Sequence, residues 1–281
     1  MSRPPQLYGC WEKIKRANEH IREFHDDIIV RRRVPFTENA IVAQRHLEIG
    51  DPNDPSTWEL EQFIFTLANT PPPVSLGFTI LAGEAVHHLR SVLDHLVYQL
   101  VIAHTKKPPC FNSAFPIVGK GRMKKKVWVP AADEYKAQTS RLKQDITPSA
   151  EALIYNLQPF KRGATFHEDP LWQLTELDNA YKHQLLMLTV QGVSLYEVVV
   201  TDASGRTARD TFTPSVKFEH GTEIGRLNIT GFDAEVRVDG DLILNVAFDK
   251  VGRRKLVPVI PHLAQLAAYV MRVVDSFNEE F

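Results

Sequence analysis

The spacing of apolar residues along this chain changes from helical to extended and back to helical. Apolar residues that recur every three or four positions predict helices over about 10–30, within 75–185 and over about 257–279. Between the last two helical parts, alternating apolar and polar residues predict the main sheet, over about 186–250. Strands and helices in separate blocks favour an α+β fold, and we expect a helical bundle packed with an antiparallel sheet or meander.

Shorter signals add detail to this organisation. Alternation over about 41–67 predicts two short strands, and Asp239-Gly240 indicates a hairpin turn inside the main sheet. A helix break is expected near Thr147-Pro148, whereas Asp169-Pro170 is typical of a helix start. Residues 105–130 are expected to form a loop.

Length and composition limit the classes of function. A chain of 281 residues without an internal repeat is expected to form a single α+β unit over 1–281. The net charge of -1 excludes a whole-protein attraction to DNA or to anionic membranes. No apolar stretch could span a bilayer, and the two cysteines, Cys10 and Cys110, favour a reducing cytoplasm over a disulfide framework. Because dinucleotide-binding, P-loop and hydrolase motifs are absent, we predict no organic cofactor.

The helix expected over about 76–104 has one apolar and one polar face. The polar face holds no Lys and a single Glu, whereas a solvated helix face is usually filled with both. We interpret this face as a polar interior or the wall of a cleft. Its residues are Glu84, His87, His88, Ser91, Asp94, His95 and Tyr98.

A second helix, opening at Asp169-Pro170, places Asp178 within its apolar arc. A carboxylate that faces inward needs a partner. We therefore predict that Asp178 belongs to the site, together with its neighbours Asn179, Lys182 and His183 as binding residues.

Two motifs resemble those of a group of uncharacterised bacterial proteins. Residues 83–96, GEAVHHLRSVLDHL, match a GEA-x-H-x-LRS-x-LDHL helix, and residues 177–183, LDNAYKH, match an LDN-x-x-KH helix. The resemblance covers roughly 75–185 and implies no established activity. It points to the same residues as the helical spacing.

The chain also resembles the HEPN superfamily of helical RNases and nucleotide-binding modules, through Arg90 and His95 with four residues between them. This resemblance implies metal-independent RNA cleavage or RNA binding of the toxin or defence kind. His95 would be the base, Arg90 would stabilise the phosphate, and Asp178 would orient one of them. Arg90 and His95 lie about 140° apart on a helix, so they converge only across a homodimer or through flexible side chains. Backbone phosphates could then contact the basic run Lys120, Arg122, Lys124, Lys125 and Lys126.

Two other interpretations fit the same residues. A divalent metal could bind Glu84, His88 and His95, with Asp178 or His183 completing the site. Alternatively, these side chains form a structural network that fixes helix packing, in a non-catalytic module that binds a ligand or a partner. Contact between the two motif helices is left open by the sequence.

Overall fold

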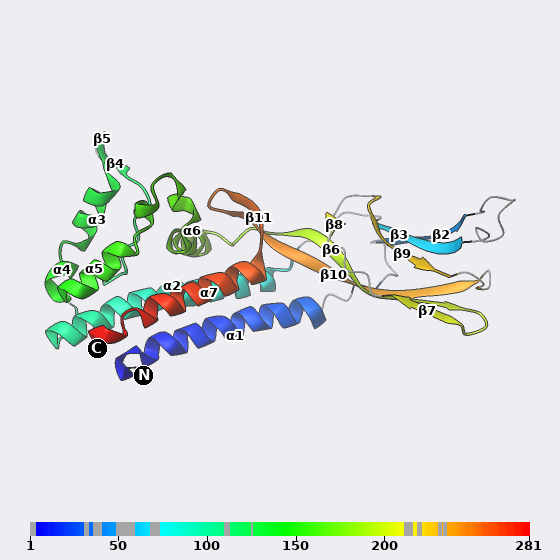
Figure 1. Ribbon diagram of the computed structural model, residues 1–281, viewed down its shortest axis with the longest axis horizontal. Helices are drawn as coiled ribbons and strands as arrows, with labels where there is room; N and C mark the ends of the chain where they lie inside the picture. Colours follow the sequence, from blue (N-terminus) through cyan, green and yellow to red (C-terminus); the bar gives the residue numbers. More distant parts are fainter. Residues whose placement is uncertain are drawn as a thin grey trace. The chain divides into compact units, whose positions relative to one another are not determined.

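The computed structural model describes residues 4–30, 34–35, 41–48, 60–67, 74–109, 113–124, 126–210, 216–217, 221–229, 232 and 235–281. Its helices and antiparallel strand pairs confirm the predicted α+β class (Figure 1). The chain divides into two compact units where the sequence predicts one. The helical unit comprises Met1–Phe24, Leu76–Met187 and Phe248–Phe281, and the sheet unit comprises His25–Ser75 and Leu188–Ala247.

Three long helices form the framework of the helical unit. They are α1 (Tyr8–Val30), α2 (Leu76–Thr105) and α7 (Val259–Asp275), and they confirm the helices predicted over 10–30, 76–104 and 257–279. The rings of Phe24 and Phe78 meet edge to face at 5.2 Å, and the Cys10 thiol lies 3.8 Å from the carbonyl oxygen of Val92. α1 therefore packs along α2 through its apolar stripe. α7 also contacts α2, and its apolar face is buried.

Shorter helices follow α2 and lead to the second motif. They are α3 (Ala131–Thr139), α4 (Leu142–Asp145), α5 (Pro148–Asn156), the 3-10 segment η3 (Pro159–Glu168) and α6 (Pro170–His183), with the turns η1 (Pro5–Leu7) and η4 (Asn278–Glu280) near the chain ends. The side chains of Thr147 and Asp169 accept hydrogen bonds from the amides of Ala150, at 3.1 Å, and Leu171, at 2.9 Å. Both act as N-caps before a proline, which confirms the predicted break and the predicted helix start.

Strands of two antiparallel sheets share one apolar core in the sheet unit. One sheet has the order β1 (Val34–Pro35), β10 (Val236–Val251), β6 (Leu188–Asp202), β7 (Thr207–Asp210), with β8 (Val216–Lys217) beside β6 and β11 (Arg254–Pro258) beside β10. The other has the order β2 (Ile41–Glu48), β3 (Leu60–Leu67), β9 (Glu223–Asn228). Phe65 of β3, Val198 of β6 and Ile224 of β9 are buried in the same cluster. The strands predicted over 41–67 and the main sheet are therefore confirmed.

Two local predictions are wrong. Asp239-Gly240 forms no turn, because both residues lie inside the continuous strand β10, and Gly240 is not among the glycines with positive φ. The stretch 105–130, expected to be a loop, contains a two-stranded hairpin of β4 (Arg122–Lys124) and β5 (Val127–Val129). Within the described residues, no helix is both long and apolar enough to cross a membrane.

Candidate functional site

The polar face of α2 divides into two groups of contacts. His87, Arg90 and Asp94 face α6 and the segment 113–118, and we call this group the α6 seam. Glu84, His88, Ser91 and His95 face α1, and we call this group the α1 seam. The polar face is therefore a helix-packing surface on both of its sides.

Asp178 joins the two motif helices in the α6 seam. Its side chain is only 2% exposed, its Oδ1 lies 3.0 Å from His87 Nδ1, and its Oδ2 lies 2.6 Å from Lys182 Nζ. One helical turn away, α2 and α6 touch at Gly83, where a Cβ would lie 2.1 Å from the ring of Tyr181. The contact left open by the sequence thus exists, and Asp178 has the partner that an inward-facing acid needs.

Arg90 and Asp94 hold the segment that follows α2. Arg90 donates to Asp94 Oδ1 at 2.5 Å and to the carbonyl oxygen of Phe115 at 2.9 Å. The amide of Phe115 in turn donates to Asp94 Oδ1 at 2.8 Å. Both backbone groups of buried Phe115 are satisfied by this pair, so the guanidinium of Arg90 is engaged in fixing the fold.

The α1 seam brings two histidines together. The rings of His20 and His88 stack with centroids 5.4 Å apart, and Glu84 Oε2 lies 3.5 Å from His20 Nδ1. Farther along the seam, Lys13 donates to Ser91 Oγ at 2.9 Å. Burial lowers the pKa of His88, and the charges of His20 and Lys13 lower it further. These contacts explain why the face carries His and Ser where a solvated face carries Lys and Glu.

His95 lies at the end of the α1 seam nearest the start of α1. A Cβ at Gly9 would come within 2.4 Å of its Nε2, so the imidazole rests directly on the α1 backbone. Its ring stacks with Tyr98 at 6.2 Å, and its Nε2 lies 3.3 Å from the amide nitrogen of Gln99. Burial, and secondly the charge of Lys13, lowers the pKa of His95. The imidazole is therefore neutral at neutral pH.

The structure places Arg90 and His95 in different seams, where they share no recorded partner. His183 is exposed at the end of α6. Among the described residues, no three His, Cys, Asp or Glu side chains form a group that could hold a metal ion. Glu84, His88 and His95 lie along one helix face and His183 lies on another helix. Their catalytic and metal-binding roles stay predictions.

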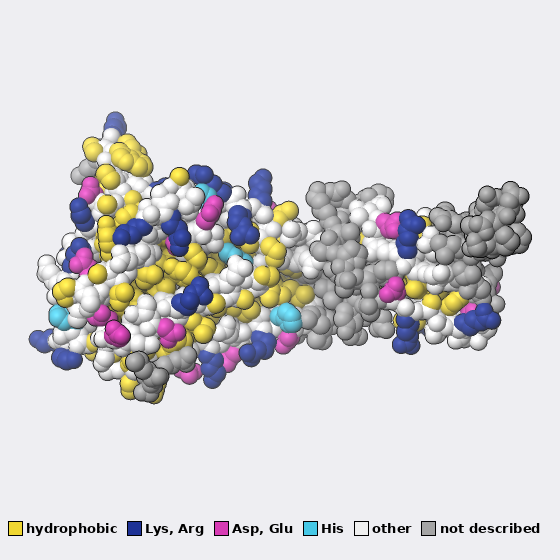
Figure 2. All heavy atoms as spheres, in the orientation of Figure 1, with side chains coloured by type: hydrophobic (Ala, Val, Ile, Leu, Met, Phe, Trp, Pro, Cys, Tyr) yellow, Lys and Arg dark blue, Asp and Glu magenta, His cyan; other side chains and the backbone are white. Residues whose placement is uncertain are grey.

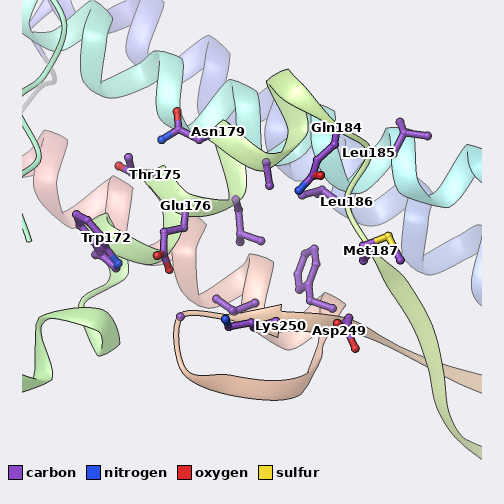
Figure 3. Close-up of a pocket in the computed structure, with 15 residues that line it drawn as sticks. Trp172, Thr175, Glu176, Asn179, Gln184, Leu185, Leu186, Met187, Asp249 and Lys250 are labelled. Carbon is purple, nitrogen blue, oxygen red and sulfur yellow. The ribbon is translucent and has the colours of Figure 1, made fainter.

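A cavity of about 560 Å³ lies on another face of α6, where β10 returns to the helical unit (Figure 3). We call it the α6 pocket. Its apolar floor includes Leu177, Leu186, Phe248 and Val251, all of them buried. The amide of Asp249 donates to the carbonyl oxygen of Met187 at 2.9 Å, which fixes the strand against the end of the α6 segment.

The charged groups of the α6 pocket stand above this floor. Trp172 and Glu176 are four residues apart, and Figure 3 shows both side chains projecting from α6 on the same side, toward the strand that carries Lys250. Trp172 is held edge to face against Phe166 at 5.2 Å. Among the described residues, Glu176 and Lys250 have no recorded ion-pair partner. The aromatic ring of Trp172 and the unpaired carboxylate of Glu176 therefore lie side by side in the pocket.

Of the site residues predicted from the sequence, Asn179 lines this pocket, as do Leu177 and Ala180 of the same motif. The other lining residues come from α6, from the segment 184–187 that follows it, and from 248–252, about 70 positions away, so helical spacing alone could not bring them together. The available signal was the pair Trp172 and Glu176 on one face of the predicted helix. Comparisons of the chain with protein families, with curated proteins and with solved structures find no match.

Proposed function

We propose that the helical unit is a non-catalytic module that binds a small organic cation, an amine with an apolar body, in the α6 pocket. The observation that carries this proposal is the unpaired carboxylate of Glu176 beside the ring of Trp172, above an apolar floor. An ammonium group is attracted both by a carboxylate and by the face of an indole ring. The remaining apolar body of the ligand would cover Leu177 and Phe248.

The contacts in the two seams support the proposal that the helical unit is not catalytic. Asp178, Arg90 and Asp94 each have hydrogen-bond or ion-pair partners within the fold, and each contact joins two elements or fixes a segment. Groups engaged in this way specify helix packing, as the structural interpretation of the sequence expects. The seams then hold α6 in place, and α6 carries the pocket.

The test uses two fluorescent probes that share a dansyl ring and differ in charge. Dansylcadaverine carries an amine, whereas dansylglycine carries a carboxylate. We expect saturable fluorescence enhancement with the amine only, because Glu176 attracts the cation. Glu176→Gln should weaken binding of the amine about tenfold.

The matched control is Glu168→Gln, which removes an exposed carboxylate outside the pocket and should leave binding unchanged. Equal binding of both probes, unaffected by Glu176→Gln, would contradict the proposal. A result in which neither probe binds would also contradict it.

The second candidate function is RNA cleavage, with the chain acting as a homodimer. The observation that favours it is the lowered pKa of His95, because a neutral imidazole at neutral pH can accept a proton from a ribose 2′-hydroxyl. A labelled single-stranded RNA is incubated with the wild type, Arg90→Ala and His95→Ala in the presence of a chelator. Loss of cleavage in both variants, each of which still shows a cooperative thermal transition, supports this function. A wild type that does not cleave the RNA excludes it.

A further inference from the structure

The β4–β5 hairpin presents two different faces. Met123 pairs with Trp128 across the hairpin, whereas Arg122 pairs with Val129, so these two pairs lie on opposite faces. Arg122 Nε donates to Glu134 Oε2 of α3 at 2.8 Å, and the Glu134 side chain is only 5% exposed. The Arg122 face is therefore fastened to the helical unit, and the Met123 and Trp128 face is turned away from this contact.

The turned-away face is apolar and well exposed. The exposed fractions are 62% for Met123 and 58% for Trp128. One side of the Trp128 ring lies over Gly121, where a Cβ would come within 2.6 Å of the indole. The ring is thus held in position on one side while the rest of its surface stays open. Figure 2 shows hydrophobic side chains gathered on this projection, with a basic side chain at its outer end.

The charge around the hairpin has a single sign. The stretch 113–132 contains Lys120, Arg122, Lys124, Lys125 and Lys126 and no Asp or Glu. Lys120, Lys124 and Lys126 are exposed and have no recorded partner among the described residues, whereas Lys125 lies outside them. The nearest acids of α3, Asp133 and Glu134, are each paired with a cation. An approaching anion would meet cations that are free to bind it.

Lys126 occupies the tip of the hairpin with φ of 69°, in the left-handed region. Glycine adopts this region without strain, whereas a lysine there is disfavoured. A positive charge is thus present at a turn position where folding alone would favour glycine. Strained positions of this kind point to a role outside folding.

We propose that the β4–β5 hairpin binds a single-stranded nucleic acid, with a base stacked on Trp128 and the phosphates held by Lys120 and Lys126. Aromatic stacking beside a row of cations is the chemistry by which proteins bind unpaired strands. A lipid surface fits less well, because Lys124 and Lys126 lie at the tip of the hairpin and would have to enter the bilayer ahead of Trp128. This site is separate from the α6 pocket and does not depend on it.

The test measures fluorescence anisotropy of labelled 20-nucleotide uridine RNA and thymidine DNA with the full-length protein at two salt concentrations. Binding of either strand that weakens with salt is expected. Trp128→Ala should weaken it about tenfold and Trp128→Phe should restore most of the affinity, because a phenyl ring still stacks. Lys126→Gly should weaken binding several-fold and make its salt dependence shallower, while leaving the melting temperature unchanged or higher.

The control is Lys136→Gln, which removes an exposed lysine of α3 that is paired with Asp133. It should leave the affinity unchanged. The proposal is overturned if neither strand binds, if duplex binds as well as single strands regardless of Trp128, or if the protein instead sediments with phosphatidylserine vesicles in a Trp128-dependent manner.

Discussion

Asp178 is the residue at which the two sequence motifs meet. Its partners His87 and Lys182 are 50% and 46% exposed, so water can solvate both side chains if the carboxylate is removed. Asp178→Ala should therefore lower the free energy of unfolding by about 1–3 kcal/mol, less than the loss of one partner from a fully buried ion pair. Chemical denaturation measures this change. Asp133→Ala, which breaks an exposed pair, should change stability by less than about 0.5 kcal/mol.

His262 should make the stability of the helical unit depend on pH. The imidazole is buried in α7 against Phe248, both ring nitrogens lack a hydrogen-bond partner among the described residues, and burial lowers its pKa from 6.5 to about 4, with a smaller contribution from Arg254. The unfolded chain binds a proton below pH 6.5 and the folded chain only below about 4. The titration of His262 therefore does not reduce the free energy of unfolding above pH 6.5, and it lowers this free energy by about 3 kcal/mol as the pH drops to 4.

The variant His262→Phe removes the titrating group and keeps a ring against Phe248. Urea unfolding at pH 7.5, 6, 5 and 4 should show a shallower loss of stability for this variant than for the wild type. His104→Asn, which changes an exposed histidine at the end of α2, should follow the wild type. Parallel pH curves for wild type and His262→Phe would show that His262 does not cause the loss.

At the scale of single residues, the sequence predicted which face of a helix a side chain lies on better than it predicted which residues that side chain contacts. Helical spacing placed Glu84, His87 and His95 on one polar face, which is correct, because the period of a helix is local. It could not tell that this face meets α1 on one side and α6 on the other, because that depends on segments more than 60 positions away. It also gave no sign that His262, whose partner ring is in β10, is buried.

At the scale of elements, the segment 113–118 is held by side chains of α2 and by Gln158, which lies between α5 and η3. Arg90→Ala removes the donor to the Phe115 carbonyl oxygen and should cost about 1–3 kcal/mol, with faster amide exchange around Phe115. Hydrogen exchange with mass spectrometry measures the local effect and urea unfolding the global one. Arg16→Ala, which removes an exposed pair with Glu19, serves as the control. Unchanged exchange around Phe115 in Arg90→Ala would contradict the anchoring role.

Elements that neighbouring residues determine were predictable from the sequence, whereas turns that depend on pairing with distant strands were not. The helix start at Asp169-Pro170 was correct because the cap and the proline act within one turn. The Asp239-Gly240 turn was wrong because both residues lie inside β10, which is paired between β1 and β6, and pairing favours the extended backbone over the local turn preference. Turns with positive φ occur at Gly205 and Gly252 instead.

At the scale of the whole molecule, the sheet unit is inserted into the helical unit at two places in the sequence. The ends left by each insertion lie close together, because Phe24 packs against Phe78 and the Asp249 amide donates to the Met187 carbonyl oxygen. A chain lacking 25–75 and 188–247, with a short Gly-Ser linker at each junction, should therefore fold as the helical unit alone.

Circular dichroism should show a helical spectrum and a cooperative thermal transition for this shortened chain. Dansylcadaverine should still bind it, since every residue that lines the α6 pocket is retained. The matched control also removes 259–281 and thereby the buried face of α7, and it should not unfold cooperatively. A shortened chain without a cooperative transition would show that the helical unit needs the sheet unit to fold.

The contact of Gly83 with Tyr181 also determines which substitutions the molecule tolerates. In the middle of most helices, replacing glycine with alanine adds stability, since glycine is the poorest helix former after proline. At position 83 the added methyl group would overlap the Tyr181 ring, so the same replacement would push α6 away from α2. Variation at this position is therefore limited by the distance between two helices, and glycine, a poor helix former, is the residue that lets this helix pack.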